Sequence, residues 1–239
     1  MGAMNSASPI RAAVPPMRGE EALRVALLLG FTGGYLDTYS WITHGVLANA
    51  QTANLVFLWV NATAGRWEQA LHFVPPLFAF FVGVTIASWL RRVIGDRAGQ
   101  LSLVVEVVVL VIVAILHNHA PGIAGTLGIS MVAAMQTSIF TRVEGAAYSS
   151  VMITGNFRQA IEGAFALAAG DPQGGLLRRS CIYVGVCAAF GTGAAAGAFF
   201  TERVPRATLV IPVAALSLVL LLCRRSHAPV PANAEVERA

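Results

Sequence analysis

Six long apolar stretches dominate this sequence. They cover approximately residues 23–43, 71–90, 101–116, 122–140, 180–200 and 207–223. A helix needs about 20 apolar residues to cross the hydrocarbon core of a bilayer, and most of these stretches are long enough to do so. The chain has no long polar segment that would cover them in a soluble protein. The sequence therefore predicts an all-α, polytopic membrane protein with six transmembrane helices.

The composition and the charge pattern narrow the possible partners. Of the 239 residues, 56% are hydrophobic and only 12% are charged. All 16 basic residues are arginines near the ends of the apolar stretches, a pattern that orients membrane proteins and does not indicate nucleic-acid binding. The three cysteines lie within apolar stretches and lack metal-ligand spacing. We expect a lipid bilayer as partner, no nucleic acid, no metal and no cofactor.

The ends of the chain differ from its middle. Residues 1–22 lack the apolar core of a signal peptide, and residues 224–239 are rich in proline and alanine. We expect a mobile N-terminal tail at 1–22, one membrane domain at 23–223 and a cytoplasmic C-terminal tail at 224–239.

Two similar motifs, "QTAN" at 51–54 and "ITGN" at 153–156, suggest an internal duplication. Aligning them also brings similar residues into register upstream and downstream. The paired positions are Thr52 with Thr154, Asn54 with Asn156, Gly33 with Ala133, and Gly83 with Gly193. We therefore expect two repeats, the first at 23–118 and the second at 122–223.

The segments that follow the two motifs are too short or too polar to cross a bilayer. After Asn54 only "LVFLWV" is continuously apolar, which gives about 9 Å of helix against a hydrocarbon core of about 30 Å. After Asn156 come Arg158 and Glu162, which are four residues apart and can pair on one helix face. We expect both Thr-x-Asn segments to be broken or re-entrant, or to lie along the membrane edge.

The arginines provide an independent test of this topology. With six helices and a cytoplasmic N-terminus, 13 of the 16 arginines face the cytoplasm. The three on the other side are Arg66, Arg203 and Arg206. If both short segments crossed, Arg91, Arg92 and Arg97 would change sides and the positive-inside bias would nearly vanish. Six helices also mean that the second three-helix repeat is inverted relative to the first, as in many transporters.

The motifs resemble those of a known family. "GYLD" at 34–37 followed by "QTAN", and "AMQT" at 134–137 followed by "SSVMITGN" at 149–156, are similar to the YoaK-like family of bacterial membrane proteins. The resemblance covers residues 23–223 and implies a multi-pass, six-helix protein of the bacterial inner membrane, in a family described as candidate metabolite transporters. It implies no particular substrate.

This chain departs from the family pattern at two positions. Ala53 stands where a glycine is expected, and Thr137 stands where an asparagine often follows the glutamine. Because alanine tolerates a positive φ poorly, we expect a left-handed turn at Gly155 and not at Ala53.

Asp37 is the first candidate site residue. Counted from Arg24, its carboxylate lies about 20 Å into the membrane, where a charge requires a partner or a cavity. It could bind a proton, a cation or the substrate, or it could only bond the neighbouring Thr-x-Asn turn. Glu106, by contrast, is expected to reach the cytoplasmic interface near Arg91–Arg97.

The two motifs supply the other candidate residues for substrate binding. Thr52, Asn54, Thr154 and Asn156 suit N-caps, because their side-chain oxygens can accept from the free N–H groups of a helix start. Two helix starts that converge near the midplane would favour a substrate with an acidic group. The alternative is structural capping only. Gln136 could line the same cavity or join two helices.

The leading functional hypothesis is a transporter of a small metabolite that works by alternating access. The alternative is a structural or regulatory membrane protein without a solute pathway. We expect no enzyme, because the sequence has no GxSxG motif, no HExxH motif and no lysine. The small-residue row "GTGAAAGAFF" at 191–200 would allow close helix packing, either within the protein or across a homodimer.

Overall fold

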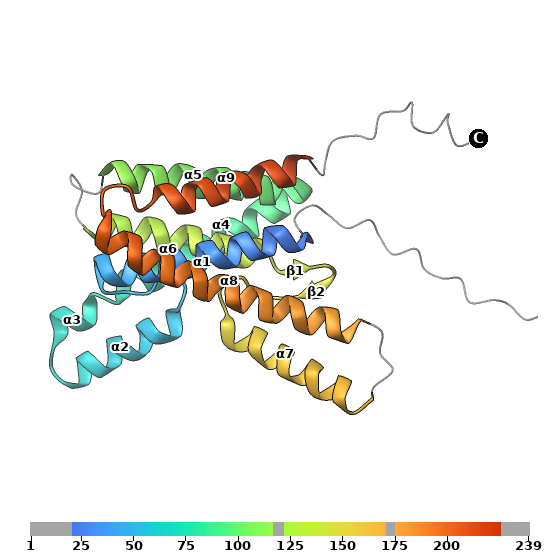
Figure 1. Ribbon diagram of the computed structural model, residues 1–239. Coiled ribbons are helices and arrows are strands. Elements are labelled where there is room, and N and C mark those ends of the chain that lie inside the picture. Colours follow the sequence, from blue (N-terminus) through green and yellow to red (C-terminus); the bar gives the residue numbers. More distant parts are fainter. Residues whose placement is uncertain (1–20, 117–121, 171–174, 226–239) are drawn as a thin grey trace, which may run out of the picture.

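The computed structural model describes residues 21–116, 122–170 and 175–225 of a mostly helical chain (Figure 1). The two predicted tails therefore lie almost wholly outside the described residues. The long helices of the described part are α1 (Leu23–His44), α4 (Val74–Ile94), α5 (Ala98–Leu116), α6 (Gly122–Ile139), α8 (Leu176–Arg203) and α9 (Val210–Arg225). Each coincides with one of the apolar stretches, so the prediction of helices there is confirmed.

Shorter elements connect the long helices. They are α2 (Gln51–Thr63), α3 (Trp67–Leu71), the 3-10 helix η2 (Gly95–Arg97) and α7 (Ile153–Ala168). One antiparallel hairpin, β1 (Arg142–Val143) with β2 (Ala146–Ala147), departs from the predicted all-α class. The departure is small because the hairpin only turns the chain between α6 and the loop before α7.

The helices of the two sequence halves pack against each other. Helix α1 packs along α8, α6 packs along α4, and α5 lies beside α9 (Figure 1). The short helices α2 and α7 lie on the side of the molecule away from α5 and α9. Both start near its middle and diverge toward opposite ends (Figure 1). Each half therefore supplies packing partners of the other, and the larger hydrophobic cluster contains residues of both halves. A smaller cluster joins α1, α7, α8 and the hairpin.

Glycines allow the central helices to approach backbone to backbone. A Cβ at Gly193 of α8 would lie 1.9 Å from the Phe31 carbonyl oxygen of α1, and one at Gly83 of α4 would lie 2.3 Å from the Met131 carbonyl oxygen of α6. These are the two glycines that the repeat places in register. The small residues of α8 thus serve contact within the molecule at Gly193, whereas Gly191 has open space around it.

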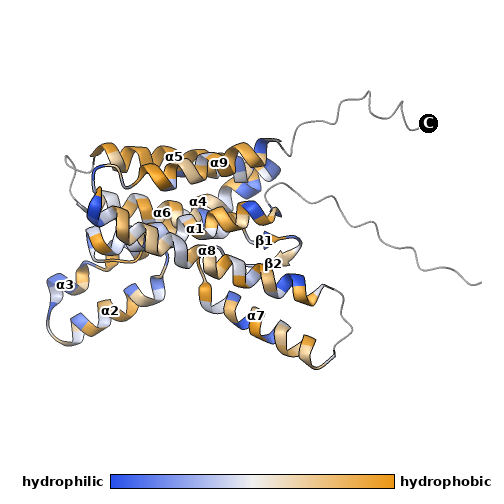
Figure 2. Cartoon of the chain, viewed as in Figure 1, coloured by the Kyte–Doolittle hydropathy of each residue, from blue (hydrophilic) through white to orange (hydrophobic). Residues whose placement is uncertain are grey.

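Three helical segments among the described residues are long and apolar enough to cross a membrane. They are Trp67–Leu116, which contains α4 and α5, then Gly122–Ile139 and Leu176–Arg203. Figure 2 shows that hydrophobic residues line the long helices and that hydrophilic ones gather at their ends. Helix α1 is more polar, but most of its residues are buried against protein. A helix that touches little lipid can carry polar groups such as Asp37.

Candidate functional site

The loop before α2 is held by Asn54. The Leu47 N–H donates to Asn54 Oδ1 (3.1 Å), and Asn54 Nδ2 donates to the Leu47 carbonyl oxygen (2.6 Å) and to Gln51 Oε1 (3.0 Å). The Asn54 side chain is completely buried. One amide therefore satisfies both backbone groups of a loop residue seven positions earlier, which a buried irregular backbone requires.

Asn156 makes the same pair of hydrogen bonds to a loop residue in the second half. We call this pair of bonds the asparagine clasp. The Ser149 N–H donates to Asn156 Oδ1 (3.3 Å), and Asn156 Nδ2 donates to the Ser149 carbonyl oxygen (2.6 Å). Asn156 is also buried, and the spacing to its loop partner is again seven residues. The two motifs thus build equivalent loops in front of α2 and α7.

These contacts correct two predictions. The residues in the N-cap positions are Ala50 and Met152, neither of which makes a side-chain cap bond. Thr52, Asn54, Thr154 and Asn156 instead lie in the first turns of the helices, and the asparagines bond backward to the loops. Gly155 has no positive φ and lies within α7, so the expected left-handed turn there is wrong. The chain bends in the preceding loop instead.

Asp37 bonds the first loop. Its Oδ1 accepts from the Asn49 N–H at 2.7 Å, and the carboxylate is only 7% exposed. Asn49 Nδ2 in turn donates to the Gly33 carbonyl oxygen (3.2 Å). Of the two alternatives for Asp37, the structure shows the bond to the turn beside it. The buried carboxyl group therefore accepts a hydrogen bond from the loop, as a buried polar group requires.

Gln136 bonds the second loop and α1. Its Nε2 donates to Ser150 Oγ (2.9 Å) and to the Leu29 carbonyl oxygen (3.1 Å). Val151 of this loop lies against Gly33, where an added Cβ would approach the valine side chain to 2.6 Å. Gly33 is about 15 Å along an α1 of about 33 Å, so both loops meet α1 at its midpoint. In this conformation Gln136 links α6 to α1 and to the second loop. Joining two helices was one of its two predicted roles.

A cavity of about 420 Å³ opens beside the second loop. Its walls are Ala147, Tyr148, Ser149, Met152, Thr154, Gly155, Asn156, Arg158 and Gln159. Thr154 and Gly155 are exposed here, and Thr52 is exposed at the corresponding position of α2. The Thr154 hydroxyl and the Arg158 guanidinium give this cavity polar groups that can orient a solute.

Another cavity of about 420 Å³ lies between α4, α5 and α6. Apart from His44, the side chains around it are apolar, so it offers little to orient a polar solute. Within the described ranges, no cluster of three or more His, Cys, Asp or Glu side chains could hold a metal ion.

Sequence reasoning missed the loop residues that the predicted residues bind. Asn49, Ser149 and Ser150 were not singled out, although all three are polar and lie just before a Thr-x-Asn motif. Leu47 and Ser149, each seven residues before its asparagine, contribute only backbone groups, so no residue type marks these two positions in the sequence. The predicted residues fall into two clusters, with Asp37 and Asn54 at the first loop and Gln136 and Asn156 at the second.

Comparison with known proteins places the chain in a family. The model of a family described as "Protein of unknown function (DUF1275)" matches residues 25–222. The chain belongs to the DUF1275 family. No curated protein matches it, and no solved structure does. The match spans all six long helices and both loops, so the site of this DUF1275 protein lies within the shared region.

Two ion pairs of this DUF1275 protein lie on α7 and at the hairpin. The predicted pair of Arg158 with Glu162 is present on α7, with Nε 3.4 Å from Oε1 and both side chains well exposed. At the hairpin, Arg178 donates from Nε to Glu144 Oε2 and from Nη2 to Oε1, both at 2.6 Å. This forked pair ties the hairpin to the start of α8.

The Glu144 pair predicts a pH dependence of stability. The hydrogen bond from Arg178 lowers the pKa of the Glu144 carboxyl below its usual 4.5. Its stabilisation is therefore complete above pH 4.5 and is lost as the pH falls through the lowered pKa. We expect Glu144→Gln to reduce the acid sensitivity of the thermal midpoint slightly, as for an exposed pair. If the thermal midpoint of Glu144→Gln fell with decreasing pH as steeply as that of the wild type, the result would contradict this assignment.

Proposed function

We propose that this DUF1275 protein transports a small metabolite across the bacterial inner membrane by alternating access. In this proposal the six long helices span the bilayer as two inverted three-helix repeats, and α2 and α7 are re-entrant half-helices. The observation that carries the proposal is the pair of equivalent asparagine clasps, which hold two helix starts near the middle of the molecule. Half-helices that start at the midplane form the substrate sites of many transporters.

The packing supports an inverted repeat. In the two repeats α1 corresponds to α6, and α4 corresponds to α8. The contact of α1 with α8 therefore corresponds to that of α6 with α4, and both contacts are present. In the same way, the contact of Gly193 with Phe31 corresponds to that of Gly83 with Met131. Helices α2 and α7 are about 20 and 24 Å long, which is less than the hydrocarbon core of about 30 Å. Neither length suits a helix that crosses the bilayer upright.

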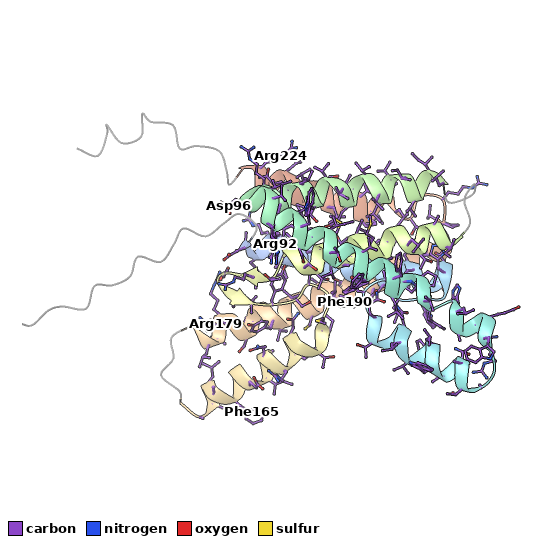
Figure 3. The ribbon with its side chains drawn as sticks, turned by 180° about the vertical axis from the view of Figure 1, so that it is seen from behind. Arg92, Asp96, Phe165, Arg179, Phe190 and Arg224 are labelled. Atoms are coloured by element: carbon purple, nitrogen blue, oxygen red, sulfur yellow. The ribbon has the colours of Figure 1, made fainter. Side chains whose placement is uncertain are left out.

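The arginines support an orientation with both ends of the membrane domain in the cytoplasm. Arg92, Arg179 and Arg224 lie at one end of the long helices, as does Asp96 (Figure 3). Arg66 and Arg206 belong to connections between helices, and Arg203 is the last residue of α8, at the opposite end of that helix from Arg179. The positive-inside rule assigns the arginine-rich end, where α1 begins and α9 ends, to the cytoplasm.

The solute site in this proposal lies where α2 and α7 begin. Thr52, Thr154 and Gly155 are exposed there and contact the solute, while Asn54 and Asn156 position the loops. Both helix starts lack a side-chain cap, so their positive dipole ends suit an acidic group of the solute. Asp37 and Gln136 hold the loops against α1 and α6, and they change partners when the loops move. The site binds and releases the solute without covalent chemistry.

One observation favours the alternative of a structural or regulatory protein without a solute pathway. Asp37, Asn54, Gln136 and Asn156 are all buried, and each bonds a loop next to it. The cavity beside α7 favours transport, because both Thr154 and Asn156 line it.

A flux measurement tests the proposal. Purified protein in proteoliposomes is screened with small carboxylic acids, and neutral metabolites of similar size serve for comparison. We expect saturable uptake of at least one acid, reduced about tenfold or more by Thr154→Val, which corresponds to a loss of about 1.4 kcal/mol in binding. Thr85→Val on the exposed face of α4 is the matched control and should transport normally.

Two results would overturn the proposal. One is uptake of every compound at the rate of protein-free liposomes. The other is equal uptake by wild type and Thr154→Val, which would remove the start of α7 from the solute path.

A further inference from the structure

Glu106 is a buried carboxyl group far from both loops in sequence. It lies eight residues after the start of α5, about 12 Å along a helix of about 28 Å, and is 1% exposed. The expected position at the cytoplasmic interface is therefore wrong. The helix starts at Ala98, a few residues before the apolar stretch, which moves Glu106 to mid-helix.

The surroundings of Glu106 offer it little charge compensation. Ser102 Oγ donates to its Oε1 at 2.9 Å. The elements packed against α5 are α4, η2, α6 and α9, and α6 carries no titratable side chain. The titratable or charged residues of the others are Arg91, Arg92, Asp96, Arg97, Cys223, Arg224 and Arg225.

These groups lie toward the cytoplasmic ends of their helices. Arg91 donates to the Ile139 carbonyl oxygen (2.7 Å), and Ser102 is the partner that the described contacts give to Glu106. An ionised carboxylate at mid-depth without a paired cation would be strongly disfavoured.

The second repeat indicates that packing does not require a carboxyl group at this position. Counted from Gly83 and Gly193, position 106 of α5 corresponds to position 216 of α9. Leu216 there is completely buried, as Glu106 is. A leucine thus fills the same place in an equivalent helix, and Leu103 and Leu110 pack on either side of Glu106 in the same core. The carboxyl group is a chemical feature added to a position that the fold can fill with an apolar side chain.

We propose that Glu106 is a proton-binding site in the membrane core. The carboxyl group is neutral in the conformation described here. When α5 moves against α9 and water reaches it, the O–H bond breaks, the proton goes to water and the carboxylate remains. Rebinding a proton from water reverses the step without another reactant. This deepens the proposed transport, for which the proton would be the coupling ion, and that coupling role rests on the proposed function.

Infrared spectroscopy tests proton binding without a transport assay. Full-length protein in lipid nanodiscs at neutral pH should show the C=O stretching band of a protonated carboxylic acid. Glu106→Gln should remove this band, whereas Asp37→Asn, which changes the other carboxyl group at depth, should retain it. A wild-type spectrum without the band, or a Glu106→Gln spectrum that keeps it, would overturn the proposal.

A second variant keeps the test decisive if Glu106→Gln does not fold. Ser102→Ala removes the hydrogen bond to Oε1, so the band should shift to higher frequency. Ser217→Ala on α9, whose hydroxyl bonds the Val213 carbonyl oxygen of its own helix, is the matched control and should leave the band in place. An unshifted band in Ser102→Ala would contradict the assignment to Glu106. Because no solute is added, a failure to find transport leaves these outcomes unchanged.

Discussion

Gly193→Ala is expected to destabilise the protein by about 3 kcal/mol or more, or to prevent its folding. The new Cβ would lie 1.9 Å from the Phe31 carbonyl oxygen and 2.7 Å from its carbonyl carbon. Neither group is the end of a flexible side chain, so α1 and α8 must move apart. Overpacking a well-packed interior costs about 1–3 kcal/mol, and a clash with backbone falls at or above that range. Denaturation of the purified protein in mild detergent measures the change.

Two further variants make this a matched series. Gly191→Ala changes a glycine of the same helix where nothing lies within 4 Å, so we expect stability close to that of the wild type. Gly83→Ala places a Cβ 2.3 Å from the Met131 carbonyl oxygen and should be destabilised in the same way as Gly193→Ala. If Gly193→Ala were as stable as Gly191→Ala, the close packing of α1 on α8 would be wrong.

Asn156→Ala and Asn54→Ala are expected to cost about 2–4 kcal/mol each. Each change removes a buried amide that satisfies one backbone N–H and one carbonyl oxygen of a loop. An unsatisfied buried polar group costs about 1–3 kcal/mol, and each variant leaves two such backbone groups without their partner. The unfolding midpoint and the protease sensitivity of the loops measure the effect.

Asn61→Ala is the control for the clasp variants. Asn61 lies on α2 and bonds the Phe57 carbonyl oxygen of its own helix and the Arg66 side chain. Because its side chain bonds only residues four and five positions away, and the bond with Arg66 is exposed, we expect a loss below about 1 kcal/mol. Equal losses in Asn61→Ala and Asn156→Ala would show that the clasp has no special structural role.

The sequence was sufficient to predict the long helices, because apolar length alone determines where helices of this kind form. It also predicted that α2 and α7 do not cross upright, and neither is among the described segments long and apolar enough to cross a membrane. The pairing of α1 with α8 was not predicted. It depends on Gly34, Gly193 and Gly197, whose close contacts join segments more than 150 residues apart.

The candidate residues were found, but their bonds were not. Asn54 and Asn156 suit N-caps by type, and propensity favours a cap at the helix start. The observed clasp runs backward over seven residues and depends on a loop that returns to the helix, which no local rule describes. From its depth alone, Asp37 was expected to need a partner or a cavity. Its partner Asn49 could be identified only once the loop was placed.

The central claim is that α2 and α7 enter from opposite sides and return to the side from which they came. Single cysteines at Ala64 and Ala169, just after these helices, test it with a membrane-impermeant maleimide. Cysteines at Arg97 and Arg206 serve as references, in a background that lacks the three native cysteines.

We expect the cysteine at position 64 to be labelled from the same side as that at 206, outside the cell. The cysteines at 97 and 169 should be labelled only from the cytoplasmic side. If α2 and α7 crossed the membrane, the cysteine at 64 would be labelled from the side opposite to 206, and that at 97 from the same side as 206. That result would contradict the six-helix inverted repeat and, with it, the site at the two helix starts.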